Sequence, residues 1–272
     1  MNRARQIAFG QQFLALHQHP GMVVVPNAWD VARAGFPAIA TTSAGIGYTA
    51  GYPVGEAMPL DAMLGDVARM ADRVDIPLSA DMESGYGIAG AEVASTVRQT
   101  IAAGAVGINI EDTDHRTPGT LFDFDLAVER IAAARNAADE TGISFVLNAR
   151  TDGYWHGGDV ASVHDDVVRR ANAFMAAGAD YIFVPGNMDF DTIARIANDI
   201  DGPLNIMGGA SCPPVSELEA AGVKRVTVGA IMARAAVAAL KKAAAELRDD
   251  GTFNFAKGIL SHAALNDTMS DE

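Results

Sequence analysis

The sequence contains very little cysteine and no long apolar run. Its 272 residues include one cysteine, Cys212, which excludes an internal disulfide framework and a zinc site built from clustered cysteines. No stretch of 18 apolar residues occurs, so we expect no transmembrane helix. These absences are typical of a protein of the reducing cytoplasm.

Positive charge is also scarce in this chain. It has 20 Lys and Arg against 34 Asp and Glu, a formal net charge of -14 and a sequence pI near 4.7. An acidic surface of this kind repels phosphate backbones and anionic lipid headgroups. We therefore expect neither nucleic acid nor a membrane as a partner.

What the sequence does contain is a regular alternation of short β-rich runs and alanine-rich helical segments. The junctions "AAGAVGINI", "AAGADYIFV" and "AAGVKRVTV" each join a helix end, a glycine turn and the next strand. No linker, low-complexity run or charge block marks a second domain. Eight strands are expected, at residues 22–26, 38–42, 77–80, 107–110, 144–148, 181–184, 203–207 and 225–229. Eight such units in a chain of this length predict a single closed (β/α)8 TIM barrel over residues 1–272.

Polar residues follow the predicted strands at their carboxyl ends, where the active sites of such barrels are built. Side chains two residues apart on a strand share a face, so Asp81 and Glu83 point the same way. Glu111 and Arg150 follow the next two strands on that side. Three neighbouring carboxylates favour a hard divalent cation, Mg²⁺ or Mn²⁺ in its place. Arg150 suits a substrate carboxylate or an enolate oxygen, and the backbone N–H groups of the turn Ser43-Ala44-Gly45 suit a second carboxylate.

The segments "DMESGYG", "GINIED" and "LNARTD", in this order, resemble the phosphoenolpyruvate mutase and isocitrate lyase superfamily. The resemblance covers most of the chain, from about residue 23 to the last predicted strand. It implies that Asp81 ligates Mg²⁺ while Glu83 and Glu111 hold water molecules around the metal. It also implies a group of substrate-binding residues made of Arg150, Trp29, Thr42, Ser43 and Ala44.

The chain departs from the superfamily at several positions. Carbon–carbon lyases of the superfamily carry a Lys-x-Cys-Gly-His loop whose cysteine protonates the departing carbanion. Here the segment 113–121 is short and has no cysteine. Val54 stands where the family often has an aspartate after Gly-Tyr-Pro, and Glu56 is a candidate to compensate. Asn187 stands where the phosphorus-handling mutase has a histidine. These departures favour the members that act on oxaloacetate-like acids.

The resulting prediction is a Mg²⁺-dependent carbon–carbon lyase. It would cleave a small α-keto or α-hydroxy acid through a metal-stabilised enolate, like an oxaloacetate decarboxylase or a 2-methylisocitrate lyase. The enolate would take its proton from water, from Tyr48 or from His115. One alternative is phosphorus–carbon chemistry of the phosphoenolpyruvate mutase or phosphonopyruvate hydrolase type. The other is a noncatalytic binding barrel. In the enzymatic cases the partner of the site is a small carboxylic acid.

The C-terminal segment is expected to form a partly apolar helix, and the N-terminal segment is polar. Residues from Ile231 to Leu247 are alanine-rich, with apolar side chains on more than one side of the expected helix, which is unusual for a surface helix. The resemblance implies that this helix is swapped between barrels. We therefore expect about residues 231–260 to form a helical segment that makes a homo-oligomer, a dimer or a tetramer. At the other end, His17 lies in a polar segment and is expected to be exposed.

Overall fold

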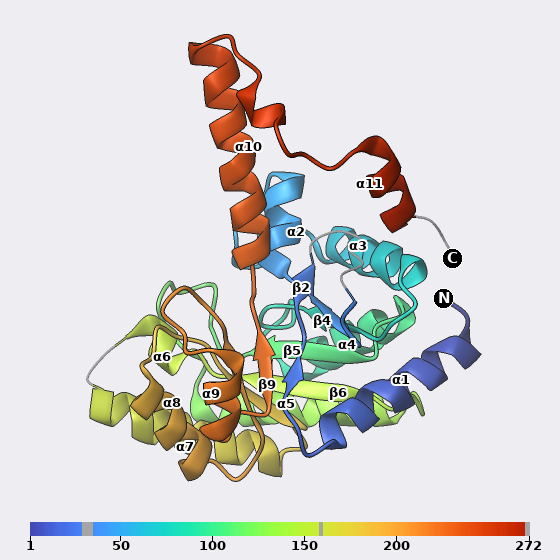
Figure 1. Cartoon of the computed structure of the whole chain (residues 1–272). Helices are drawn as coiled ribbons and strands as arrows, with labels where there is room; N and C mark the ends of the chain where they lie inside the picture. Colours follow the sequence, from blue (N-terminus) through green and yellow to red (C-terminus); the bar gives the residue numbers. More distant parts are fainter. Residues whose placement is uncertain (29–34, 158–159, 270–272) are drawn as a thin grey trace.

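The structure, a computed structural model that describes residues 1–28, 35–157 and 160–269, is a barrel of parallel strands surrounded by helices (Figure 1). Within the described residues, nine strands follow one another in the order β1-β9-β8-β7-β6-β5-β4-β3-β2, and all neighbours are parallel. The strands are β1 (Val23–Val24), β2 (Asn27–Ala28), β3 (Ile39–Thr41), β4 (Leu78–Asp81), β5 (Gly107–Glu111), β6 (Val146–Arg150), β7 (Tyr181–Val184), β8 (Leu204–Met207) and β9 (Arg225–Thr227).

One extended segment closes the barrel. It contains β1, which pairs with β9, and β2, which pairs with β3. Between these two pieces, the Val25 N–H donates to the Val226 carbonyl at 2.9 Å, and the Pro26 carbonyl accepts the Ala40 N–H at 2.9 Å. The segment therefore bonds to both edges of the sheet. The predicted (β/α)8 barrel is confirmed, with its first strand divided into two short pieces.

Helices cover the outside of the barrel. Their apolar side chains recur at helical spacing, as with Val93, Val97 and Ile101, which are all buried against the sheet. The glycines of the repeated junctions adopt the left-handed conformation predicted for helix ends, with φ of 105° at Gly104 and 102° at Gly178. The helices are α1 (Arg3–Gln18), α2 (Ser43–Ala50), α3 (Leu60–Arg73), α4 (Gly90–Ala102), α5 (Phe124–Asp139), α6 (Gly153–His156), α7 (Val160–Ala176), α8 (Phe190–Asp199), α9 (Val215–Ala220), α10 (Ile231–Asp249) and α11 (His262–Met269).

Helix α1 packs against the amino-terminal ends of the strands, opposite to the end that carries the predicted site. Its Phe13 ring approaches Gly107 at the start of β5, and its His17 carbonyl accepts the Tyr181 hydroxyl at 3.0 Å. His17 is only 8% exposed, so the expectation that it faces solvent is wrong. Burial, together with the charge of Arg225, lowers the pKa of His17 to about 3. The polar sequence of α1 suggested an exposed helix, but α1 closes the bottom of the barrel and buries His17 there.

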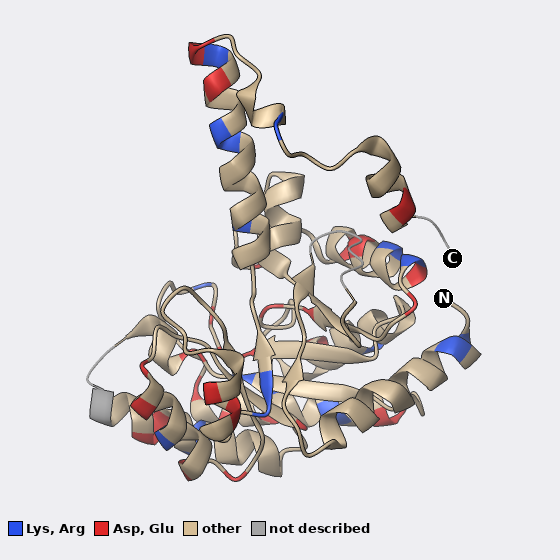
Figure 2. Ribbon diagram, in the orientation of Figure 1, with Lys and Arg blue, Asp and Glu red and all other residues tan. Residues whose placement is uncertain are grey.

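The C-terminal region stands away from the barrel as an arm. It comprises α10, a 3₁₀ turn (Asn254–Ala256) and α11 (Figure 1). Within α10, Ala233 alone is buried. Charged side chains gather in the outer half of this helix (Figure 2). None of the described helices combines the length and apolar character needed to span a bilayer. Large apolar side chains of the arm are exposed, namely Met232, Val237, Leu240, Leu247, Phe253, Phe255, Ile259, Leu260, Leu265 and Met269.

Candidate active site

The carboxyl ends of β4, β5 and β6 bring the predicted polar residues into one cluster. Asp81 lies in register with Asn109, and Glu111 lies in register with Arg150. Glu83 follows β4 directly, and its carbonyl accepts the Glu111 N–H at 2.9 Å. The structure therefore brings the three carboxylates and Arg150 together. Strand parity accounts for Asp81, Glu111 and Arg150, whereas Glu83 lies beyond the end of β4 with a φ of 50°.

Asp81 is held by hydrogen bonds from two directions. The backbone N–H and the hydroxyl of Ser43 donate to its Oδ2 at 3.0 and 2.8 Å. The side-chain amide of Asn109 donates to its Oδ1 at 3.2 Å, and Asn109 is oriented in turn by the Asn148 amide at 3.1 Å. The barrel interior and the start of α2 thus fix the orientation of this half-buried carboxylate.

Helix α2 begins where the sequence predicted a binding site for a substrate carboxylate. Its Thr42 hydroxyl accepts the Gly45 N–H at 3.3 Å, while the Ser43 N–H is engaged by Asp81. Among the described residues, the Ala44 N–H has no hydrogen-bond partner. The amide that remains to bind a carboxylate at this helix end is therefore that of Ala44. Trp29, the other residue predicted for this role, lies outside the described residues.

Arg150 is held by two carboxylates. Its Nε and Nη2 donate to Asp152 at 2.6 and 3.0 Å, and its Nη1 lies 2.8 Å from Glu111 Oε2. Burial alone would lower the pKa of Arg150, but the charges of Asp152 and Glu111 outweigh it and raise this pKa. A guanidinium has five N–H donors, so two remain for another ligand. Arg150 is 18% exposed, enough for a substrate oxygen to reach it.

The acids of the cluster lack sufficient positive charge around them. Burial raises the pKa of Glu83 to about 7, and the charges of Asp81 and Glu111 act in the same direction. Burial also raises the pKa of Glu111, even though Arg150 opposes this shift. A cation placed among these carboxylates would relieve both effects.

The donor set fits Mg²⁺ held mainly through water. No three His, Cys, Asp or Glu side chains of the described residues are placed to bind one ion together. Mg²⁺ does not require such a group, because it keeps several waters and binds through one or two carboxylates. The Tyr86 hydroxyl is buried beside these acids and has no partner among the described residues. Asp81 would therefore ligate Mg²⁺ directly, and Glu83, Glu111 and Tyr86 would contact the waters that the ion keeps.

The two predicted proton donors differ in position. The Nε2 of His115 lies 2.9 Å from Glu111 and 3.7 Å from Glu83, although without the geometry of a good hydrogen bond. Burial alone would lower the pKa of His115, but its contact with Glu111 and the negative charges nearby outweigh it and raise the pKa. Tyr48 lies on α2 with 45% of its surface exposed. The structure thus brings His115 into contact with the carboxylates and leaves Tyr48 partly exposed on α2.

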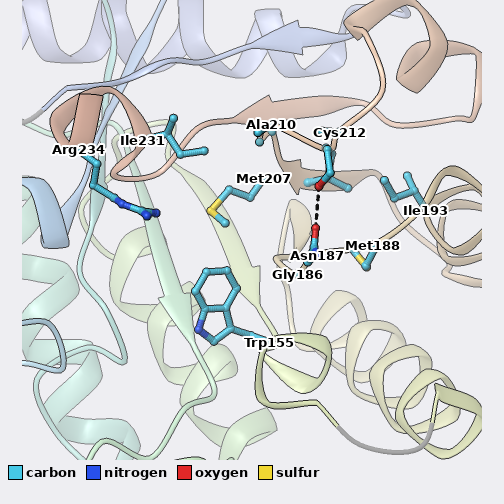
Figure 3. Close-up of a pocket in the computed structure, with 14 residues that line it drawn as sticks. Trp155, Gly186, Asn187, Met188, Ile193, Met207, Ala210, Cys212, Ile231 and Arg234 are labelled. Atoms are coloured by element: carbon cyan, nitrogen blue, oxygen red, sulfur yellow. Dashed lines mark hydrogen bonds between the residues drawn. The ribbon is translucent and has the colours of Figure 1, made fainter. Parts of the chain in front are cut away.

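A pocket of about 210 Å³ lies beyond the ends of β7, β8 and β9, and sequence reasoning missed it (Figure 3). Met207 lines this pocket and also a cavity of about 40 Å³ in the barrel interior, to which Asp81 and Arg150 contribute. The pocket and the cavity beside the cluster therefore share Met207 as a wall. Ser211 donates to Asn187 at 2.7 Å on one wall. Arg234 of α10 lines another wall and forms no ion pair with described residues.

Only part of this pocket had a signal in the sequence. Gly186, Gly208 and Gly209 follow predicted strands, where small residues leave open space. Arg234 gave no signal because it belongs to the first turn of a helix that was interpreted as an oligomer contact. Parity along the strand puts Asp152, two residues beyond Arg150, on the same side, and its hydrogen bonds to the guanidinium are a finding of the structure.

Known proteins with similar sequences and structures share this architecture. The family described as phosphoenolpyruvate phosphomutase matches residues 13–248. A crystal structure from Burkholderia cenocepacia J2315, assigned as a lyase or mutase, has a TM-score of 0.91 at 40% identity and covers 97% of this chain and 96% of its own. The 2-methylisocitrate lyase of Salmonella typhimurium is 30% identical over 243 residues, which are 85% of this chain and 80% of that protein. The oxaloacetate decarboxylase of Paraburkholderia xenovorans is 32% identical over 200 residues, 65% of this chain and 64% of that protein. The chain belongs to the phosphoenolpyruvate phosphomutase family, within the superfamily of lyases and mutases that includes isocitrate lyase.

Proposed function

We propose that this protein is a Mg²⁺-dependent carbon–carbon lyase that acts on a small 2-oxo or 2-hydroxy diacid, as an oxaloacetate decarboxylase does. The observation that carries the proposal is the group of three carboxylates beside Arg150, with Glu83 and Glu111 buried and Asp81 half-buried, at the end of the barrel where such enzymes place their sites. The names of the related lyase and decarboxylase support the same class of reaction.

The residues of the cluster divide into binding and proton-transfer roles. The two remaining donors of Arg150 and the N–H of Ala44 would bind the oxygens of the 2-oxo acid. Mg²⁺ held by Asp81 would supply a Lewis acid that polarises the 2-oxo group. Cleavage releases the distal carboxylate as CO₂ and leaves its electron pair in an enolate. His115 then donates its proton to the enolate carbon, and the nearby carboxylates, which raise its pKa, favour the protonated ring.

The short loop after β5 supports a decarboxylase more than a lyase of branched tricarboxylates. It runs from Asp112 to Asp123 without a cysteine, and Thr113 and Leu121 form a bridge across it. A decarboxylase needs only a proton for the enolate, which His115 would give. The pocket with Arg234 is suited to a second acidic group, so a diacid fits the site better than a monoacid.

The test is turnover of 2-oxo diacids by the purified protein. Oxaloacetate with Mg²⁺ should give pyruvate at least about 100-fold above the uncatalysed Mg²⁺ rate, and EDTA should abolish the gain. Phosphonopyruvate and phosphoenolpyruvate should give no new ³¹P NMR signal. A phosphorus signal would replace this proposal with phosphorus–carbon chemistry. If no 2-oxo or 2-hydroxy acid is turned over with Mg²⁺ or Mn²⁺, a noncatalytic binding barrel is the better interpretation.

A further inference from the structure

Two loops that meet beside the carboxylate cluster hold unusual backbone conformations. One loop joins α2 to α3 and contains Glu56, and the other joins β4 to α4 and contains Glu83 and Tyr86. These three are the non-glycine residues with positive φ in the described chain, at 56°, 50° and 54°. A side chain makes this conformation unfavourable, so it persists only where the surroundings enforce it, and such positions cluster at functional sites.

The two loops bind each other through their glutamates. The Glu83 carboxylate accepts the N–H groups of Gly55 and Glu56 at 2.7 and 2.8 Å. In return, Oε1 of Glu56 accepts the Ser84 hydroxyl and the Tyr86 N–H, both at 2.7 Å. Each glutamate thus satisfies donors of the opposite loop. We call these five residues the glutamate clasp.

Arg130 holds the β4–α4 loop from its other side. This α5 residue is 1% exposed, and its guanidinium lies 4.1 Å from the centre of the Phe122 ring. It donates to the carbonyls of Gly87 and Ile88, at 2.5 Å each, and to the carbonyl of Ser84. No ion pair among the described residues includes Arg130. A buried arginine whose hydrogen bonds go to backbone carbonyls holds that segment of backbone in one conformation.

The clasp also accounts for the departure at position 54. Val54 is 55% exposed and does not reach the cluster. Its loop contacts Glu83 through the backbone N–H groups of Gly55 and Glu56 instead. The Glu56 side chain, a candidate to compensate for Val54 near the metal, is directed at Ser84 and Tyr86. Its effect on the cluster therefore passes through the loop that carries Glu83.

We propose that Glu56 and Arg130 are positioning residues that fix the loop from Glu83 to Ile88, so that the Glu83 carboxylate stays at the barrel mouth. The role rests on the proposed function, because it concerns the placement of an acid in that reaction. Displacement of a catalytic group by about 1 Å is enough to lower a rate by about 100-fold. Loss of either residue should therefore affect both the order of the loop and turnover.

The experiment compares Glu56→Ala with Glu56→Gln and Arg130→Lys. Glutamine keeps an oxygen that accepts both hydrogen bonds of Oε1, alanine removes it, and lysine keeps the charge of Arg130 without its planar fork. Hydrogen exchange measured by mass spectrometry reports the order of residues 83–88, and kcat/KM reports turnover. Glu140→Ala is the matched control, because Glu140 is 68% exposed and lies at the C-terminal end of α5, where it pairs with Arg98 and with neither loop of the clasp.

Glu56→Ala and Arg130→Lys should raise amide exchange in residues 83–88 by about 10-fold or more and lower kcat by about 100-fold, with KM changed by less than about 3-fold. Glu56→Gln should restore both quantities to within about 3-fold of the wild type, and Glu140→Ala should change neither. Should Glu56→Ala fail to fold, Ser84→Ala, which removes one of the two donors to Glu56, should show smaller changes in the same direction.

Two results would overturn the proposal. Unchanged exchange in Glu56→Ala and Arg130→Lys would show that the clasp does not hold the loop. Raised exchange with unchanged kcat would show that the clasp is structural and does not position Glu83 for the reaction. A wild type without Mg²⁺-dependent turnover would contradict the proposed function instead, and exchange would then still decide whether the clasp orders the loop.

Discussion

The two sides of the barrel mouth are built differently. On the β4–β6 side, Asp81, Glu111 and Arg150 are bound by neighbouring side chains and backbone at distances of 2.6 to 3.2 Å. On the β7–β9 side there is a pocket of about 210 Å³ with glycine-rich walls and with Arg234, which forms no ion pair within the described part of the chain. The first side is preorganised, as a reacting centre requires. The second has open space and few fixed contacts, as a surface that selects the rest of the substrate requires. Changes on the first side should alter kcat, and changes on the second should alter KM.

The largest effect is expected from Asp81→Ala. It removes the carboxylate best placed to ligate Mg²⁺, so kcat/KM should fall by about 1,000-fold or more, equivalent to about 4 kcal/mol. Titration calorimetry should detect Mg²⁺ uptake by the wild type and none by the variant. Asp75→Ala, at a position 74% exposed, is the control and should bind the ion normally. Undiminished Mg²⁺ binding by Asp81→Ala would show that the β4–β6 side does not hold the metal through Asp81.

A somewhat smaller effect, on stability, is expected from Glu83→Gln in the metal-free protein. The pKa of Glu83 is raised from 4.5 to about 7, so the folded protein binds this proton more tightly than the unfolded chain does. The stabilisation of the folded state by this bound proton is therefore full below pH 4.5 and is lost as the pH rises through 7.

In EDTA, the stability of Glu83→Gln relative to the wild type should rise across this pH range by at most about 3 kcal/mol. Urea unfolding at pH 4.5, 6 and 8 measures the difference. Added Mg²⁺ should reduce this stability difference, since the ion supplies the missing positive charge to the wild type. A stability difference that does not vary with pH would show that burial does not raise the pKa of Glu83.

On the open side, Arg234→Met should have a more modest effect. The KM for a diacid substrate should rise by about 10-fold, equivalent to about 1.4 kcal/mol, while kcat should stay within about 3-fold. A monoacid competitor should bind wild type and variant equally, because it leaves Arg234 unused. If kcat fell and KM stayed constant, Arg234 would belong with the reacting groups and the two sides would not be separate.

The smallest effect on chemistry is expected from Leu240→Glu in the arm. We propose that a second copy of the chain covers the exposed apolar residues of α10, giving a dimer or a tetramer. Leu240 is 68% exposed, and a buried charge there would oppose association. Light scattering after gel filtration should show an oligomer for the wild type and a smaller species for the variant. Lys241→Glu, the neighbouring exposed position, is the control, and a monomeric wild type would contradict the proposal.

Much of the barrel and of its preorganised side could be predicted from the sequence. The alternation of faces along a strand placed Asp81, Glu111 and Arg150 together, because the strand carries this information locally. Glu83 lies beyond the end of β4 in a left-handed conformation, so its position depends on the loop. The repeated glycine junctions predicted where helices end for the same reason.

Other features depended on contacts between distant segments. The Glu56 carboxylate is directed by a left-handed loop, and its partners Ser84 and Tyr86 come from another unit of the barrel. Arg234 enters the pocket from a helix far along the chain. His17 is buried because α1 closes the bottom of the barrel, although its sequence looks polar. Local pattern fixes none of these, since each is set by tertiary packing.

The arm has a consequence for how this protein behaves on dilution. A helix of 19 residues with one buried side chain has little to keep it folded by itself. If association supplies that missing burial, mass action links the order of α10 to the amount of protein present. Because Arg234 belongs to this helix and also lines the pocket, dilute solutions would then lose substrate affinity before the barrel itself unfolds.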